Sequence, residues 1–287
     1  MENKINKIMV GLGVLVTAGI TIIRCATMKS LQDLNRNSFE LSTVSIVLFV
    51  VLFAILLLMT IRKKTSVPPL KEIGSPWKKL VSTAAIVLGG TLFVTYLIDA
   101  YQLIFNGVTP PPVPPSSNSI DRVFVVIILV VGLASAIFFV WLGIAGLSGK
   151  QLKGTKFAAS ALLPALWLWV RLLRYEISST SAVNVKQSFY DFVMLIFALL
   201  FLFAFARYIS GVGEKKYRSL LVFAICTFTM CLSVTITRFV MYVTNFDAAY
   251  LANPIAGVAD FFVGLFALCV AVALTANAMP RFKKSKT

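Results

Sequence analysis

Histidine is absent from all 287 residues of the chain. This absence removes the commonest general base, the commonest zinc ligand and the usual haem ligand together. Cysteine is scarce, and the four that occur have no CxxC spacing and lie in or beside apolar runs: Cys25, Cys226, Cys231 and Cys269. We therefore expect small buried thiols rather than a disulfide framework, and neither a cofactor nor a metal site.

Charge is scarce as well. Only 13% of the residues are charged and 59% are hydrophobic, whereas a soluble globular protein has about 25% charged residues. The mean hydropathy is +0.89, and a single soluble core of this length could not hide so much apolar surface. The composition therefore excludes a water-soluble domain and predicts an integral membrane protein.

Eight apolar stretches approach or exceed the length of about 20 helical residues that crosses a bilayer. We predict an all-α, polytopic bundle of transmembrane helices that forms one integral membrane domain over residues 1–287. The first stretch is short and flanked by basic residues, as in a signal peptide. It lacks an A-x-A cleavage site and a lipobox, so we expect a retained helix; without it, seven spans would remain. The predicted spans are 8–23, 41–61, 80–105, 123–147, 157–175, 189–210, 219–245 and 257–279.

Basic residues are distributed unevenly among the connecting segments. The segment 62–79 contains six, whereas the segments 106–120 and 245–255 contain none. By the positive-inside rule, the basic segments and both termini are cytoplasmic. This topology puts 19 basic and three acidic residues inside and eight of each outside, so membrane insertion explains the net charge of +16 without nucleic acid. The expected partner of the inner face is a bilayer with anionic headgroups.

Polar residues form stripes at helical spacing on the third, fifth and seventh spans, and each stripe leads toward the outer end. Polar faces of membrane helices point into the bundle, and arginine suits the recognition of carboxylate or phosphate. We therefore predict an outward-facing charged pocket for a small zwitterionic or anionic solute, in which Asp99 and Asp260 pair with Arg171, Arg174 and Arg238. Tyr101 and Tyr175 are expected as further aromatic walls. The candidate ligand-binding residues are Asp99, Gln102, Trp167, Arg171, Arg174, Arg238 and Asp260.

The same charges also have a structural interpretation. Each even-numbered span begins near an acidic residue, as at Asp191 and Asp260, and acids stabilise helix N-termini through the macrodipole. Asp99 is the exception, because it lies near the negative end of its helix. Interhelical ion pairs and interface anchors would account for the remaining charges. Pro164 should kink the fifth span.

A hydrolase is the weakest of the functional alternatives. The sequences Tyr190-Asp191 and Gly257-Val-Ala-Asp260 resemble the YD and GxGD motifs of presenilin-like proteases. Ala259 replaces the second glycine, however, the PAL sequence precedes both motifs instead of following them, and both aspartates lie at outer ends. No serine nucleophile motif, phosphate-binding loop or metal-ligand cluster occurs. We therefore predict a membrane protein that is not an enzyme.

The leading functional hypothesis is the binding or translocation of a small solute through the outer pocket. The alternative is a structural or regulatory subunit that binds a protein partner or a second copy through its basic inner segments and small-residue helix faces. The basic inner segments are typical of a cell membrane protein, and we expect the bacterial plasma membrane.

Overall fold

The computed structural model describes residues 2–32, 38–62, 75–105, 119–149, 155–178, 185–211, 218–244 and 254–276. All secondary structure in these ranges is helical, which confirms the predicted all-α class. The helices are α1 (Glu2–Gln32), α2 (Ser38–Arg62), α3 (Ser75–Phe105), α4 (Ser119–Leu147), α5 (Thr155–Ser160), α6 (Leu163–Ser178), α7 (Val185–Ile209), α8 (Arg218–Val243) and α9 (Pro254–Ala276). Most of the basic segment 62–79 lies outside the described residues.

Seven of the helical stretches are long and apolar enough to cross a membrane, and α2 contains a shorter one, Thr43–Met59. The chain is thus a multi-pass helical protein of the membrane type. The first span is longer than the predicted range 8–23. It covers Ile5–Thr27 within a helix of 31 residues. Arg24 interrupts the apolar run in the sequence, but its side chain is buried, so the helix continues through it.

The fifth span is broken, as Pro164 predicts. α5 and α6 are separated by the turn at residues 161–162. Proline has no amide hydrogen for the helical bond to the carbonyl of Ser160. Just before it, the amide of Leu162 bonds the carbonyl of Ala159, only three residues back, at 3.1 Å. The regular pattern resumes where the Leu166 amide bonds the Leu162 carbonyl at 2.9 Å.

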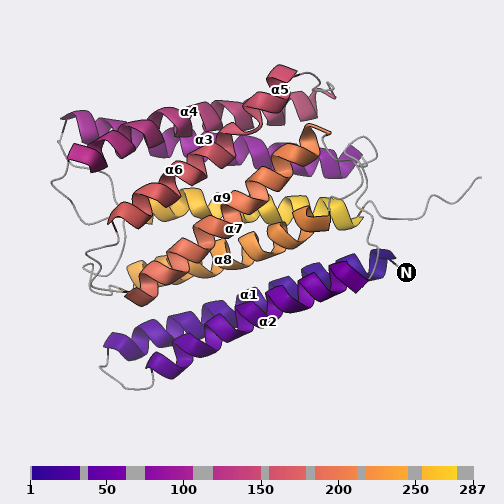
Figure 1. The fold of residues 1–287 in the computed structure, drawn as a ribbon, viewed down its shortest axis with the longest axis vertical. Coiled ribbons are helices and arrows are strands. Elements are labelled where there is room, and N and C mark those ends of the chain that lie inside the picture. The colour runs from indigo at the N-terminus through magenta and orange to yellow at the C-terminus, as the bar shows by residue number, and fades with distance from the viewer. Residues whose placement is uncertain are drawn as a thin grey trace, which may run out of the picture.

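Six spans form a closed ring, and the α1–α2 hairpin packs against it. Around the ring α3 contacts α4, α4 contacts α6, α6 contacts α7, α7 contacts α8, α8 contacts α9, and α9 contacts α3. α1 joins the ring through α8 and, less closely, α9, and Figure 1 shows α1 and α2 together at one edge of the molecule. As a result, α8 lies between the hairpin and the rest of the ring.

The helices alternate in direction along the chain (Figure 1). Two contacts show that α1 and α8 are parallel: Thr17 donates to Thr229 at 3.1 Å, and the Cys25 thiol lies 3.9 Å from the Thr237 hydroxyl. Eight crossings in alternation would place α1 and α8, the first and seventh, in the same direction. The assignment of one side to the cytoplasm stays a prediction.

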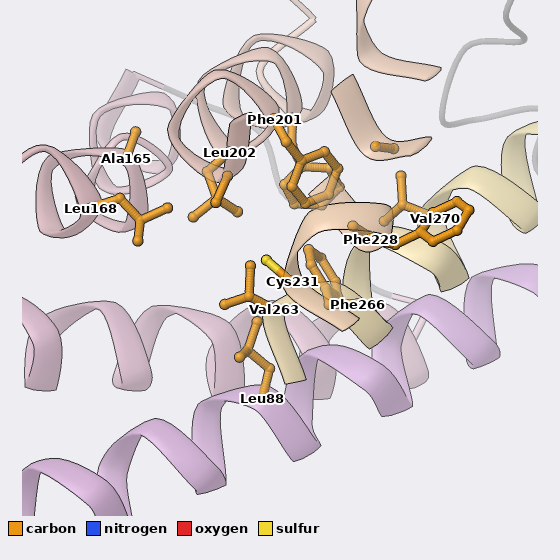
Figure 2. Packing of buried hydrophobic residues seen from close by; sticks show 14 of the residues in the cluster. Leu88, Ala165, Leu168, Phe201, Leu202, Phe228, Cys231, Val263, Phe266 and Val270 are labelled. Atoms are coloured by element: carbon orange, nitrogen blue, oxygen red, sulfur yellow. The ribbon is translucent and has the colours of Figure 1, made fainter. Parts of the chain in front are cut away.

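Aromatic side chains fill the core between α4, α7 and α9. The Phe266 ring lies edge-on to three others, with centroids 5.1 Å from Phe205, 6.0 Å from Phe201 and 5.4 Å from Phe139. Figure 2 shows Phe201 and Phe266 among the aliphatic residues that surround them. Edge-to-face pairs fix the relative position of rings more tightly than aliphatic contacts do. This core therefore sets the spacing of the helices that hold the charged residues.

Small residues bring α3 and α4 close together. A Cβ atom on Gly89 would lie 2.8 Å from the carbonyl oxygen of Ala136 and 2.9 Å from the amide nitrogen of Val140. Such close approach favours packing between membrane helices. A Cβ on Gly90 would meet nothing within 4 Å, so only Gly89 of this pair makes the contact.

Candidate functional site

A layer of charged side chains is buried toward the ends of α1, α6, α7, α8 and α9 that the predicted topology places outside. Charges inside a membrane protein are costly unless they are paired, and they mark solute pathways, relays or structural pairs. At this level ion pairs join α6 to α9 and α7 to α8. The buried charged residues are Arg24, Arg174, Asp191, Arg238 and Asp260, and the half-buried Arg171 belongs with them.

Arg171 of α6 and Asp260 of α9 form a bidentate ion pair. Nη1 donates to Oδ1 at 2.7 Å and Nη2 donates to Oδ2 at 3.1 Å. The side chains keep 14% and 6% of their exposure, so little solvent competes with the pair. Both carboxylate oxygens are satisfied by one guanidinium, which is the strongest geometry for this pair of groups. We call Arg171–Asp260 the closed pair.

Two aromatic residues hold the arginine of the closed pair in place. The Cζ atom of Arg171 lies 5.1 Å from the ring centroid of Trp167, a distance at which the cation is attracted to the ring. Trp167 is fully buried, and its indole N–H donates to the hydroxyl of Tyr96 on α3. The closed pair is therefore connected to α3 as well as to α6 and α9.

Asp99 lies beside the closed pair without joining it. The residue is half-buried and within electrostatic range of Arg171 and Arg174. It makes no ion pair within 4 Å among the described residues. Gln102, one turn further along α3, is also half-buried. The structure thus brings Asp99 near two arginines, as predicted, but the predicted direct pairing is absent from the described part of the chain.

Arg238 of α8 pairs with Asp191 of α7, and not with Asp99 or Asp260 as predicted from the sequence. Its Nη2 donates to Oδ2 of Asp191 at 2.5 Å. The other oxygen, Oδ1, is buried and has no hydrogen-bond partner among the described residues. We call Arg238–Asp191 the open pair. Asp191 and Asp260 interact electrostatically, so the two pairs belong to one layer.

Residues from the α1–α2 hairpin surround the open pair. The guanidinium of Arg24 lies 3.8 Å from the ring centroid of Tyr190, next to Asp191 in the chain, and it is within electrostatic range of Asp191. The hydroxyls of Tyr190 and Ser45 share a hydrogen bond. Sequence reasoning missed Asp191 and Arg24 as site residues, and the helix macrodipole already accounted for Asp191.

The polar stripe of α8 points into the bundle, as predicted. Thr227 donates to the carbonyl of Phe197 on α7 at 2.8 Å, and Thr235 donates to the carbonyl of Cys231 at 2.6 Å. These hydroxyls use backbone acceptors, which lowers the cost of burying them.

The prediction of an aromatic wall is partly wrong. Tyr101 is 58% exposed, and its ring packs against the neighbouring ring of Phe105.

The two aspartates of the protease-like motifs are each paired with a different arginine. An aspartyl dyad needs two carboxylates at one site, one of them kept neutral by the other. Here Asp260 has both oxygens on Arg171, and Asp191 has one oxygen on Arg238. This arrangement is typical of two separate ion pairs and gives no support to a shared catalytic proton.

Together these contacts describe one layer of charge in which the closed pair joins α6 to α9 and the open pair joins α7 to α8. Comparisons of the chain with protein-family models, with curated proteins and with solved structures found no match.

Proposed function

We propose that this protein binds, and passes across a membrane, a small anionic or zwitterionic solute at its outer layer of charge. The observation that carries the proposal is the burial of arginines from three helices, α1, α6 and α8, at one level beside Asp99 and the two ion pairs. The guanidinium group of arginine recognises carboxylate and phosphate. Ionisable residues inside a membrane bundle cost stability and are therefore candidates for a functional role.

The proposal includes no catalytic step. It places the protein in a bacterial plasma membrane with its basic segments in the cytoplasm, which is supported by the distribution of lysine and arginine along the sequence. Anionic headgroups on that side would attract the basic segments by about 1 kcal/mol per residue.

A thermal-unfolding screen of the purified protein against small acids and zwitterions tests the proposal. A ligand at a hundredfold excess over its Kd adds about 2.7 kcal/mol of stability, so at least one compound should raise Tm by several degrees. Asp99→Asn, at a half-buried position without a described ion pair, should fold and should alter that shift. A screen in which no compound stabilises the wild type would refute the proposal.

The alternative proposal is a structural or regulatory subunit of a membrane complex. It is favoured by the closed pair, because a bidentate pair between α6 and α9 with both oxygens filled braces two helices and leaves nothing for a ligand. Purification in mild detergent distinguishes the two proposals. A stoichiometric partner is expected for a subunit, and an isolated monomer that binds a solute is expected for a solute-binding protein.

A further inference from the structure

The closed pair and the open pair differ in how many hydrogen-bonding positions are filled. In the closed pair both oxygens of Asp260 accept from Arg171. In the open pair Asp191 uses only Oδ2, and Arg238 makes a single described hydrogen bond, from Nη2. The open pair therefore keeps one acceptor and several N–H donors at adjacent positions.

The free acceptor is the more informative of these groups. Oδ1 of Asp191 is buried and has no partner among the described residues, although buried polar atoms are nearly always hydrogen-bonded. Exposure does not distinguish the two pairs, because the side chains of Arg238 and Asp191 keep 9% and 12% and those of the closed pair keep 14% and 6%. A small molecule that reaches the pair would supply the missing donor.

The charges around the pair define the donor. Asp191 faces Arg238 from α8, and Arg24 from α1 lies within electrostatic range, while Asp260 on α9 interacts with it from the closed pair. These two guanidinium groups disfavour a further cation at Oδ1, because like charges repel. The donor that fits is a neutral O–H, and the group beside it must accept from Arg238.

We infer that the open pair Arg238–Asp191 binds a small acid whose anionic oxygen and neutral hydroxyl lie on neighbouring atoms, as in a 2-hydroxy carboxylate. The acid accepts hydrogen bonds from Arg238, and its hydroxyl donates to Oδ1 of Asp191. The closed pair braces the bundle and does not touch the ligand. This inference rests on the proposed function and narrows it from anionic or zwitterionic solutes to hydroxy acids.

The test uses three pairs of acids that differ by one hydroxyl: glycolate and acetate, lactate and propionate, malate and succinate. Their Kd values for the purified full-length protein are measured by ligand-dependent unfolding, with inorganic phosphate as a further probe of the same chemistry. At least one hydroxy acid should bind about tenfold more tightly than its partner without the hydroxyl. Equal Kd values within every pair would overturn the inference, and binding of phosphate alone would assign the site to inorganic oxyanions.

Variants distinguish the two pairs. Asp191→Asn leaves an oxygen for Arg238 but puts an amide N–H₂ in place of Oδ1, so the tenfold preference should fall to about twofold or less. Asp260→Asn is the matched control and should keep the preference. If Asp191→Asn fails to fold, the Kd values of the three pairs of acids for the wild type still test the inference.

The broader screen separates failure of this inference from failure of the proposed function. A ligand that binds with the same affinity to the wild type and to Asp191→Asn overturns the inference and leaves the proposed function standing. If no compound in the screen or in the three pairs binds, both are overturned.

Discussion

The closed pair and the open pair use the same two residue types at the same level of the bundle, yet they are built differently. Arg171 and Asp260 satisfy each other through two hydrogen bonds, whereas Arg238 and Asp191 share one and leave Oδ1 without a described partner. In a saturated pair no carboxylate oxygen remains to accept a hydrogen bond from a ligand, so the pair stabilises the fold. An unsaturated pair costs stability, and a site that keeps such a cost is a candidate for binding.

The largest effect is expected from breaking the closed pair. Asp260→Ala should destabilise the protein by about 3–5 kcal/mol, because it leaves a largely buried arginine without its counter-charge. Chemical unfolding in detergent measures the loss. The double variant Arg171→Met with Asp260→Leu should recover most of it, since replacement of both charges by apolar groups is often neutral. A loss below about 1 kcal/mol for the single variant would show that the closed pair is not a brace.

Breaking the open pair should cost less. Arg238→Gln removes one hydrogen bond to a charged group, for which about 2 kcal/mol is expected, and Asp191 keeps its interaction with Arg24. The same unfolding assay compares the two arginines, with Arg171→Gln as the counterpart. A larger loss of unfolding free energy for Arg238→Gln than for Arg171→Gln would contradict the assignment of the closed pair as the brace.

A smaller effect is expected at the contact between α3 and α4, which fixes the position of the helix that carries Tyr96. Gly89→Ala should lose about 1–3 kcal/mol, because the added Cβ meets the backbone of α4 and overpacking is destabilising. Gly90→Ala is the adjacent control and should be neutral or slightly stabilising, since its Cβ has open space and alanine is the better helix former. Equal effects at the two glycines would contradict the close approach of α3 and α4.

The smallest effect is expected where Trp167 links the closed pair to α3. Trp167→Phe removes the hydrogen bond to Tyr96 and keeps an aromatic face for Arg171, so a loss of about 1 kcal/mol is expected. Trp169 lies on the same helix and is 49% exposed, so Trp169→Phe should stay within about 0.5 kcal/mol. Thermal unfolding of both variants in one detergent provides the comparison.

Much of the architecture could be predicted from the sequence. Apolar length locates the eight helical regions, the lack of a proline amide hydrogen places the break near Pro164, and the cost of charge in lipid turns the polar stripes inward. The pairing of Arg171 with Asp260 follows from the same cost. These predictions depend on local chemistry, which a single chain displays directly.

The partner of Arg238 could not be predicted, because that choice depends on which helices are neighbours. The predicted outer side has eight acidic residues, and nothing in the spacing distinguishes Asp191 from Asp99 or Asp260. The length of the first helix was underestimated for a related reason. Arg24 ends the apolar run in the sequence, and its contact with Tyr190 on α7 helps to explain why the helix continues past it.

The most direct test of the difference between the two pairs is the Kd ratio of succinate to malate, measured side by side on Asp191→Asn and Asp260→Asn. If the open pair binds the ligand and the closed pair braces the bundle, the ratio should fall toward one in Asp191→Asn and stay near its wild-type value in Asp260→Asn. A ratio that is lost in Asp260→Asn and kept in Asp191→Asn would contradict the assignment of both pairs.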